Sequence, residues 1–240
     1  MRGLLLAWAC ACMPSVAAAQ GLLPAPVPED PVAVRNYLDQ AKRVVDAAAQ
    51  PAAPWNGPRD GPRAQRAKRI AVVAEDLRNG GVLGVVDGVL EAARVVGWNA
   101  KIFDTGGTPE LRLKMLANAL ESRPDGLVIV GGDARAVLPA LRPFAERSIP
   151  IVGWHVAAQA GAVPGTPVAM NVSTDPLEVA RVTALAAIAE SGGRAGVVIF
   201  TDSGYRLPQE KADAMAAVVR ACSGCTLLEM RDVPISRNQE

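Results

Sequence analysis

The sequence has little of what enzymes and nucleic-acid-binding proteins need. It has one histidine, and its formal net charge of +1 gives no electrostatic reason to expect nucleic acid or an anionic membrane surface as a partner. It contains no G-x-G-x-x-G dinucleotide fingerprint and no Walker A phosphate-binding loop. The only histidine, His155, lacks the G-x-S-x-G partner of a hydrolase, and no His and Cys spacing fits a metal site. We therefore expect no catalysis, no cofactor and no bound metal.

Aromatic side chains are also scarce, at 4% of the residues, although 50% of the chain is hydrophobic. Small and branched residues such as Ala, Val and Leu are abundant instead, and they suit helices packed closely on a buried parallel sheet. The length of 240 residues allows one or two domains with a substantial core.

Long hydrophobic runs are missing except at the amino terminus. Arg2 is followed by an apolar stretch from Leu4 to Val16 and by the small residues Ala17-Ala18-Ala19, which predicts a secretion signal cleaved before Gln20 and a periplasmic protein. The stretch is shorter than the ~20 residues that span a bilayer, so a cleaved signal is favoured over a membrane anchor. The two cysteines inside it lack the leucine three positions earlier that a lipoprotein signal would have.

After the signal, the sequence divides into an arm and two α/β units. In the arm, Asp30 can cap a helix over residues 31–49 with Pro31 at its first position, and a Pro- and Gly-rich linker follows. A Gly/Pro-rich loop at 161–167 marks a second boundary. The expected segments are the signal peptide at 1–19, the arm and linker at 20–66, a first α/β lobe at 67–160 and a partial second α/β lobe at 161–240.

Short apolar strands alternate with helices from Arg69 onward. The expected strands span residues 70–74, 100–103, 126–130, 149–152, 168–172, 196–200 and 226–231. Thr108-Pro109 and Asp175-Pro176 combine a capping side chain with a first-turn proline, which is typical of helix starts, and further helices are expected over 134–147 and 209–221. Repeated β–α units of this length imply right-handed crossovers and an α/β fold of parallel sheet flanked by helices.

Ligands of parallel α/β sheets bind at the carboxyl ends of the strands. In this sequence, polar or Gly-rich loops follow apolar strands at residues 75–81, 104–107, 131–135, 153–156 and 201–207. These loops, with the helix after the last of them, hold the candidate ligand-binding residues: Asp76, Arg78, Asn79, Asp133, Trp154, His155, Tyr205, Arg206 and Lys211.

Each candidate also has a purely structural interpretation. Asn79 can cap the next helix while its charged neighbours are solvated, and Asp133 can belong to an ordinary turn. A lone histidine such as His155 is more often structural than a ligand, but Trp154 beside it places an aromatic ring next to a hydrogen-bonding group, which suits a sugar-like solute. The charged residues after Tyr205 can equally be solvated surface.

Cys222 and Cys225 form a C-x-x-C pair. Redox-active pairs of this kind lie at helix N-termini, where the helix dipole lowers the thiol pKa. This pair instead follows a helix and lies at the negative end of its dipole, where a thiolate is disfavoured. We therefore expect a structural disulfide rather than redox chemistry or free thiols.

Four segments carry a resemblance to a known family. They are KRIAVV at 68–73, RNGG at 78–81, PDGLVI at 124–129 and IPIVGWH at 149–155. In this order and spacing, they resemble the first lobe of type I periplasmic solute-binding proteins, the ribose- and galactose-binding kind that feed ABC transporters. The WNGP at 55–58, Trp154-His155 and TDSGY at 201–205 resemble a less-studied branch of substrate-binding proteins. The resemblance covers about residues 68–236.

The resemblance implies two Rossmann-like lobes joined by a hinge, with the ligand between them. By position, Arg78 and Asn79 match the first-lobe ligand loop. Trp154 and His155 stand where sugar binders often carry an Asp-Arg pair, and Lys211 stands where they often carry an arginine. These departures argue against a plain ribose- or galactose-like ligand.

The function that the resemblance implies is periplasmic binding of a small, polar, sugar-like solute by a monomer, for delivery to the membrane permease of an ABC transporter. The alternative is a ligand-binding sensor partner of a membrane signalling protein. A regulator of the lac-repressor type would need an N-terminal helix-turn-helix. In the family, further β–α units follow the strand that matches Thr226–Arg231, so we also expect an incomplete second lobe, as in a truncated product or a fragment.

Overall fold

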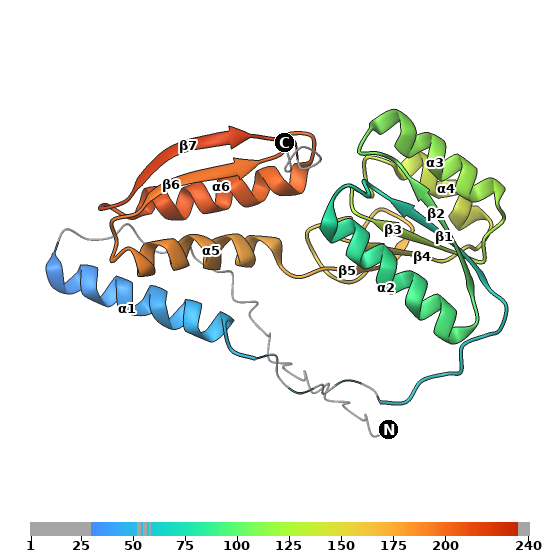
Figure 1. Ribbon diagram of the computed structural model, residues 1–240, viewed down its shortest axis with the longest axis horizontal. Helices are drawn as coiled ribbons and strands as arrows, with labels where there is room; N and C mark the ends of the chain where they lie inside the picture. The colour runs from blue at the N-terminus through green and yellow to red at the C-terminus, as the bar shows by residue number, and fades with distance from the viewer. Residues whose placement is uncertain (1–29, 52–53, 55–56, 58, 235–240) are drawn as a thin grey trace, which may run out of the picture.

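The computed structural model describes residues 30–51, 54, 57 and 59–234. The signal peptide predicted for residues 1–19 lies outside the described residues. The described elements form two α/β lobes, the first on the right and the second on the left of Figure 1. Residues 173–175 connect β5 of the first lobe to α5 of the second. No helix within the described ranges combines the length and the apolar character needed to cross a membrane.

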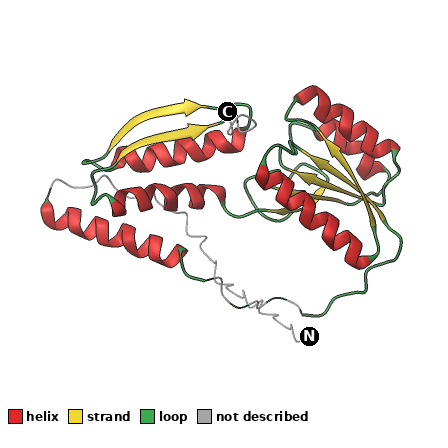
Figure 2. Cartoon of the chain, in the orientation of Figure 1, coloured by secondary structure: helices red, strands yellow, loops and turns green. Residues whose placement is uncertain are grey.

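The first lobe contains a five-stranded parallel sheet in the order β2-β1-β3-β4-β5. Its strands are β1 (Arg69–Ala74), β2 (Asn99–Asp104), β3 (Gly126–Val130), β4 (Ile151–Trp154) and β5 (Val168–Val172). Its helices are α2 (Gly80–Val96), α3 (Pro109–Glu121) and α4 (Leu138–Glu146). Alternate residues of β1 pack on opposite faces, because Val72 joins the core under α2 whereas Val73 joins the core under α3 and α4 (Figure 2).

Helix starts in this lobe follow the capping signals of the sequence. The Asn79 side chain accepts a hydrogen bond from Gly81 N at 2.9 Å, and Thr108 caps α3 with Pro109 directly after it. The predicted helix over 134–147 is shorter in the structure, because α4 begins only at Leu138. That start places Pro139 in the first turn, where its missing N–H leaves no hydrogen bond unmade.

The strand β5 differs from the sequence expectation, which assigned residues 161–240 to the second lobe. In the structure, β5 pairs in parallel with β4 and completes the first sheet. The connection between β4 and β5, residues 155–167, contains no helix and is an irregular loop. A Gly/Pro-rich segment marks a turn or loop without saying whether that loop joins two strands of one sheet or two lobes.

The second lobe combines α1 (Pro31–Ala48), α5 (Pro176–Glu190), β6 (Gly196–Thr201), α6 (Arg206–Ala221) and β7 (Thr226–Asp232). Asp30 and Asp175 cap α1 and α5, as the sequence predicts. The helix α1, set apart as an arm by the sequence, packs on α5 and buries Ala41 against Leu185 and Ile188. Figure 2 shows β6 and β7 as a two-stranded parallel sheet above α6.

The face of the β6–β7 sheet that points away from its helices is apolar and exposed. Phe200 is 65% exposed and Leu228 is 62% exposed, and Val198 is also exposed beside them. A sheet of only two strands has an unpaired edge on each strand. This face of the second lobe therefore leaves large apolar side chains uncovered.

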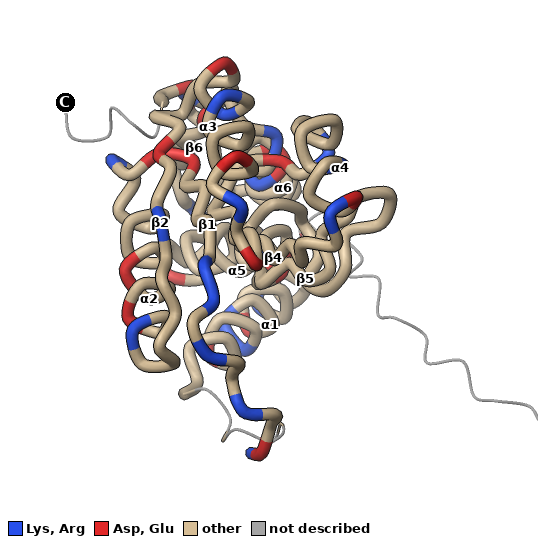
Figure 3. The backbone as a smooth tube through the Cα atoms, turned by 90° about the vertical axis from the view of Figure 1, so that its right-hand side faces the viewer, with Lys and Arg blue, Asp and Glu red and all other residues tan. Residues whose placement is uncertain are grey.

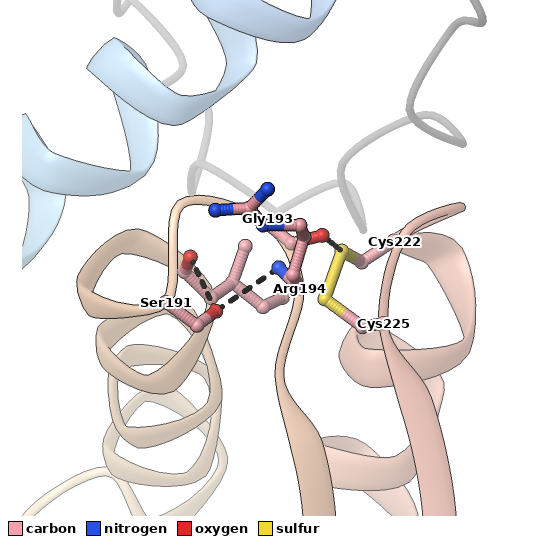
Figure 4. The surroundings of a disulfide bond; sticks show 6 residues. Ser191, Gly193, Arg194, Cys222 and Cys225 are labelled. Atoms are coloured by element: carbon pink, nitrogen blue, oxygen red, sulfur yellow. Dashed lines mark hydrogen bonds between the residues drawn. A yellow bond between two sulfur atoms is a disulfide. The ribbon is translucent and has the colours of Figure 1, made fainter.

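The disulfide predicted between Cys222 and Cys225 is present and closes the turn between α6 and β7 (Figure 4). The sulfur of Cys222 lies 3.6 Å from the carbonyl oxygen of Gly193, in the turn that leads into β6. Gly224 approaches the same carbonyl so closely that a Cβ atom there would lie 2.3 Å from it. The disulfide thus closes one turn, which packs closely against the Gly193 turn at the end of the lobe.

Candidate functional site

A cavity of about 1280 Å³ lies between the lobes, lined by loops at the carboxyl ends of β1, β3, β4 and β6 and by the first turns of α6. All but one of the predicted ligand-binding residues contribute to its lining: Asp76, Asn79, Asp133, Trp154, His155, Tyr205, Arg206 and Lys211. The exception is Arg78. The cavity is where the strand-end rule places a ligand, and the binding role of these residues stays a prediction.

Arg78 contacts the loops behind the cavity wall. Its Nε and Nη2 atoms each lie 2.9 Å from a carboxylate oxygen of Asp76, and Nη2 also donates to the Gly106 carbonyl at 3.0 Å. The hydrogen bond from Arg78 lowers the pKa of Asp76, although burial acts in the opposite direction. Asp76 is therefore a buried, ionised acceptor, and Arg78 holds it in place.

A second ion pair, between Glu75 and Arg112, lies at the base of the cavity and was missed by the sequence analysis. Glu75 follows β1 directly, and Arg112 comes from the first turns of α3. The Arg112 Nε atom lies 2.8 Å from one carboxylate oxygen of Glu75, and its Nη2 atom contacts the other. Their side chains are only 7% and 15% exposed. The position of Glu75 directly after an apolar strand could have marked it as a candidate site residue. Nothing in the local sequence around Arg112 indicates that it pairs with Glu75.

Trp154 and His155 form the wall at the end of β4. Their rings lie edge to face with centroids 4.4 Å apart. His155 has a φ of +51°, in the left-handed region that non-glycine residues rarely adopt. Such backbone strain of about 1–3 kcal/mol persists at sites where the surroundings enforce it. Burial, together with the nearby charge of Lys211, lowers the pKa of His155, so its ring is neutral near pH 7 and offers one donor and one acceptor.

The opposite wall comes from the second lobe. The helix α6 begins at Arg206, three residues earlier than the predicted start at 209, so Arg206 lies in its first turn rather than in a loop. The Arg206 Nε atom pairs with Glu210 at 2.7 Å. Tyr205 reaches the first lobe, because a Cβ atom on Gly107 would lie 3.1 Å from its hydroxyl oxygen. Burial and the charge of Glu75 raise the pKa of Tyr205.

Charges of both signs are interspersed along the chain, in keeping with a net charge of +1 (Figure 3). Within the cavity, carboxylates and cations likewise alternate, and most of them are hydrogen-bonded or paired. In the described ranges, no three His, Cys, Asp or Glu side chains gather closely enough to hold a metal ion. The arrangement is chemically suited to hydrogen bonding with a polar solute.

A parallel five-stranded sheet whose strand-end loops face a second α/β lobe across a cavity defines the class of two-lobed solute-binding proteins. The chain belongs to the periplasmic binding protein family, because residues 70–239 match the model described as periplasmic binding protein domain. No curated protein matches the chain.

Several solved structures share the fold. They include the arabinose-binding component of an ABC transporter from Shewanella sp. ANA-3 (13% identity, TM-score 0.61, 70% of this chain and 55% of that chain covered). A glucose-galactose binding protein from Geobacillus stearothermophilus is similar at 20% identity and a TM-score of 0.59, over 70% of this chain and 59% of that chain. A 5-methylthioribose transporter solute binding protein from Thermotoga lettingae TMO is similar at 17% identity and a TM-score of 0.61, over 70% of this chain and 51% of that chain. The chain thus matches little more than half the length of these structures.

Proposed function

We propose that the protein binds a small, polar, sugar-like solute in the cavity between its lobes and delivers it to the membrane permease of an ABC transporter. The observation that carries this proposal is the cavity itself, in which polar strand-end loops of both lobes surround Trp154. The similar structures that are described as binding arabinofuranose and 5-methylthioribose support a sugar-like ligand class.

The chemistry of the walls fits such a solute. Trp154 presents an aromatic ring on which the apolar face of a sugar can stack. The carboxylates of Asp76 and Asp133 and the amide of Asn79 offer fixed acceptors and donors for hydroxyl groups. Because Asp76 is already held by Arg78, little ordering accompanies its contact with a ligand. These side chains bind and orient a solute, and the protein acts without catalysis.

The proposal also includes export to the periplasm as a monomer, with the signal peptide cleaved before Gln20. Family membership supports the periplasmic location, since the family is that of periplasmic binding proteins. Cleavage is measured by intact mass of protein recovered from the periplasm. A chain that retains Met1 contradicts export by this signal.

A titration of the full chain tests binding. Thermal-shift measurements with D-glucose, D-galactose, L-arabinose, D-ribose and their corresponding acids identify the best probe, and calorimetry then gives its Kd. Trp154→Ala should weaken that Kd by about tenfold, because a stacking contact is worth about 1–1.5 kcal/mol. Trp98→Ala is the matched control, since Trp98 hydrogen-bonds to Gln65 O outside the cavity.

Two results contradict the proposal. The first is the absence of any thermal shift with every probe. The second is an equal loss of affinity in Trp154→Ala and Trp98→Ala, because a loss shared with a residue outside the cavity reports general destabilisation of the lobe.

A further inference from the structure

The cations that line the cavity differ in whether they already have a partner. Arg112 is paired with Glu75, and Arg206 is paired with Glu210. Arg135 also lines the cavity without an ion pair, but it is exposed. Lys211 is partly buried on α6, and no carboxylate of the described residues lies within ion-pair distance of it. A partly buried lysine that lines a cavity and has no ion-pair partner can bind an anionic group of a ligand.

Lys211 faces the strained end of β4 across the cavity. Both side chains line the same cavity, and after burial the positive charge of Lys211 is the second cause that lowers the pKa of His155. The ring of Trp154 lies against that of His155. A cation from the second lobe therefore lines the same cavity as a neutral hydrogen-bonding ring and an aromatic ring from the first lobe.

We infer that the solute is a sugar acid whose carboxylate lies between Lys211 and His155 while its ring stacks on Trp154. One lysine matches the single negative charge of a carboxylate, and the imidazole adds one hydrogen-bond donor. A phosphate, with its greater charge and three acceptor oxygens, would call for more donors than Lys211 and His155 supply. The hydroxyl groups at the other end of such a solute meet the carboxylate of Asp133.

This assignment rests on the proposed function, and binding of matched probes separates the two. Calorimetry on the full chain compares D-glucuronate and D-galacturonate with D-glucose and D-galactose, and D-glucosamine and D-glucose 6-phosphate complete the set. At least one acid should bind about tenfold or more tightly than its neutral counterpart, because a hydrogen bond to a charged group contributes about 1.5–3 kcal/mol.

Three variants assign the preference to the cation. Lys211→Gln should abolish the difference between acid and neutral sugar, and Lys211→Arg should retain most of it. Lys114→Gln, on the exposed surface of α3, removes the same charge outside the cavity and should leave the preference unchanged. Both positions are on helices and accept unbranched side chains, so circular dichroism should show folded protein for all three variants.

The outcomes are distinct. A neutral sugar or glucosamine that binds as tightly as the acids overturns the inference and leaves the proposed function standing. Tightest binding of glucose 6-phosphate overturns the carboxylate assignment. A preference for acid that survives Lys211→Gln also overturns it, and no binding of any probe contradicts the proposed function together with the inference.

Discussion

Removal of Arg112 from its pair with Glu75 should be the most destabilising polar substitution in the first lobe. Arg112→Met preserves much of the side-chain volume but leaves the carboxylate of Glu75, which is 7% exposed, without its cation. Breaking a buried ion pair from one side costs about 3–5 kcal/mol, because the remaining charge is desolvated and unpaired. The cavity gives water some access to this pair, so we expect about 3 kcal/mol, at the lower end of that range.

Urea unfolding followed by far-ultraviolet circular dichroism measures this loss. In a thermal scan, the same loss corresponds to a fall in Tm of about 6–12 °C for a protein of this size. Arg181→Met is the matched control, because Arg181 pairs with Glu178 in an exposed i,i+3 pair that contributes about 0.2–1 kcal/mol. The double variant Glu75→Gln/Arg112→Met should recover part of the stability, since it leaves no unpaired buried charge.

The reasoning is refuted if Arg112→Met costs no more than Arg181→Met. It is also refuted if the double variant is less stable than Arg112→Met alone, because the unpaired carboxylate would then not be the source of the loss. Either result would mean that solvent in the cavity screens Glu75 almost completely.

Two further predictions concern the disulfide and pH. The Cys222→Ser/Cys225→Ser variant should lose about 2 kcal/mol of stability, as chain entropy predicts for a short closed loop; urea unfolding with and without reductant measures it, and a wild-type chain indifferent to reductant contradicts it. The Arg78 hydrogen bond lowers the pKa of Asp76 below its ordinary 3.8, so this contribution to stability is present above pH 3.8 and is lost as the pH falls through the folded value. Asp76→Asn should therefore flatten the acid limb of the stability curve, and an unchanged limb would exclude the pair as its source.

Local signals in the sequence predicted most of the elements that hold the site. Asp30, Thr108 and Asp175 each cap a helix that begins at the following proline. The apolar runs that end at Ala74 and Val130 are buried parallel strands with polar loops after them. These signals lie in a few adjacent residues, so they can be read from the local sequence even though burial and pairing of the strands depend on tertiary contacts.

Features that depend on contacts between distant residues were not predictable in the same way. The strand β5 joins the first sheet because it pairs with β4, and no property of Val168–Val172 alone distinguishes that partner from a strand of the second lobe. The pair of Glu75 with Arg112 joins residues 37 positions apart. Likewise, the packing of α1 on α5 depends on a face whose partner is more than a hundred residues away along the chain.

Each ion pair at the cavity lies within a single lobe. Glu75–Arg112 and Asp76–Arg78 lie within the first lobe, and within the described residues no ion pair joins one lobe to the other. Relative movement of the lobes therefore breaks no such pair. A solute held by Trp154 on one side and by the second lobe on the other would add to the polar contact that Tyr205 already makes with Glu75 of the first lobe. Substitutions on either wall should then weaken the same binding event, whereas only those that break an internal pair should also destabilise a lobe.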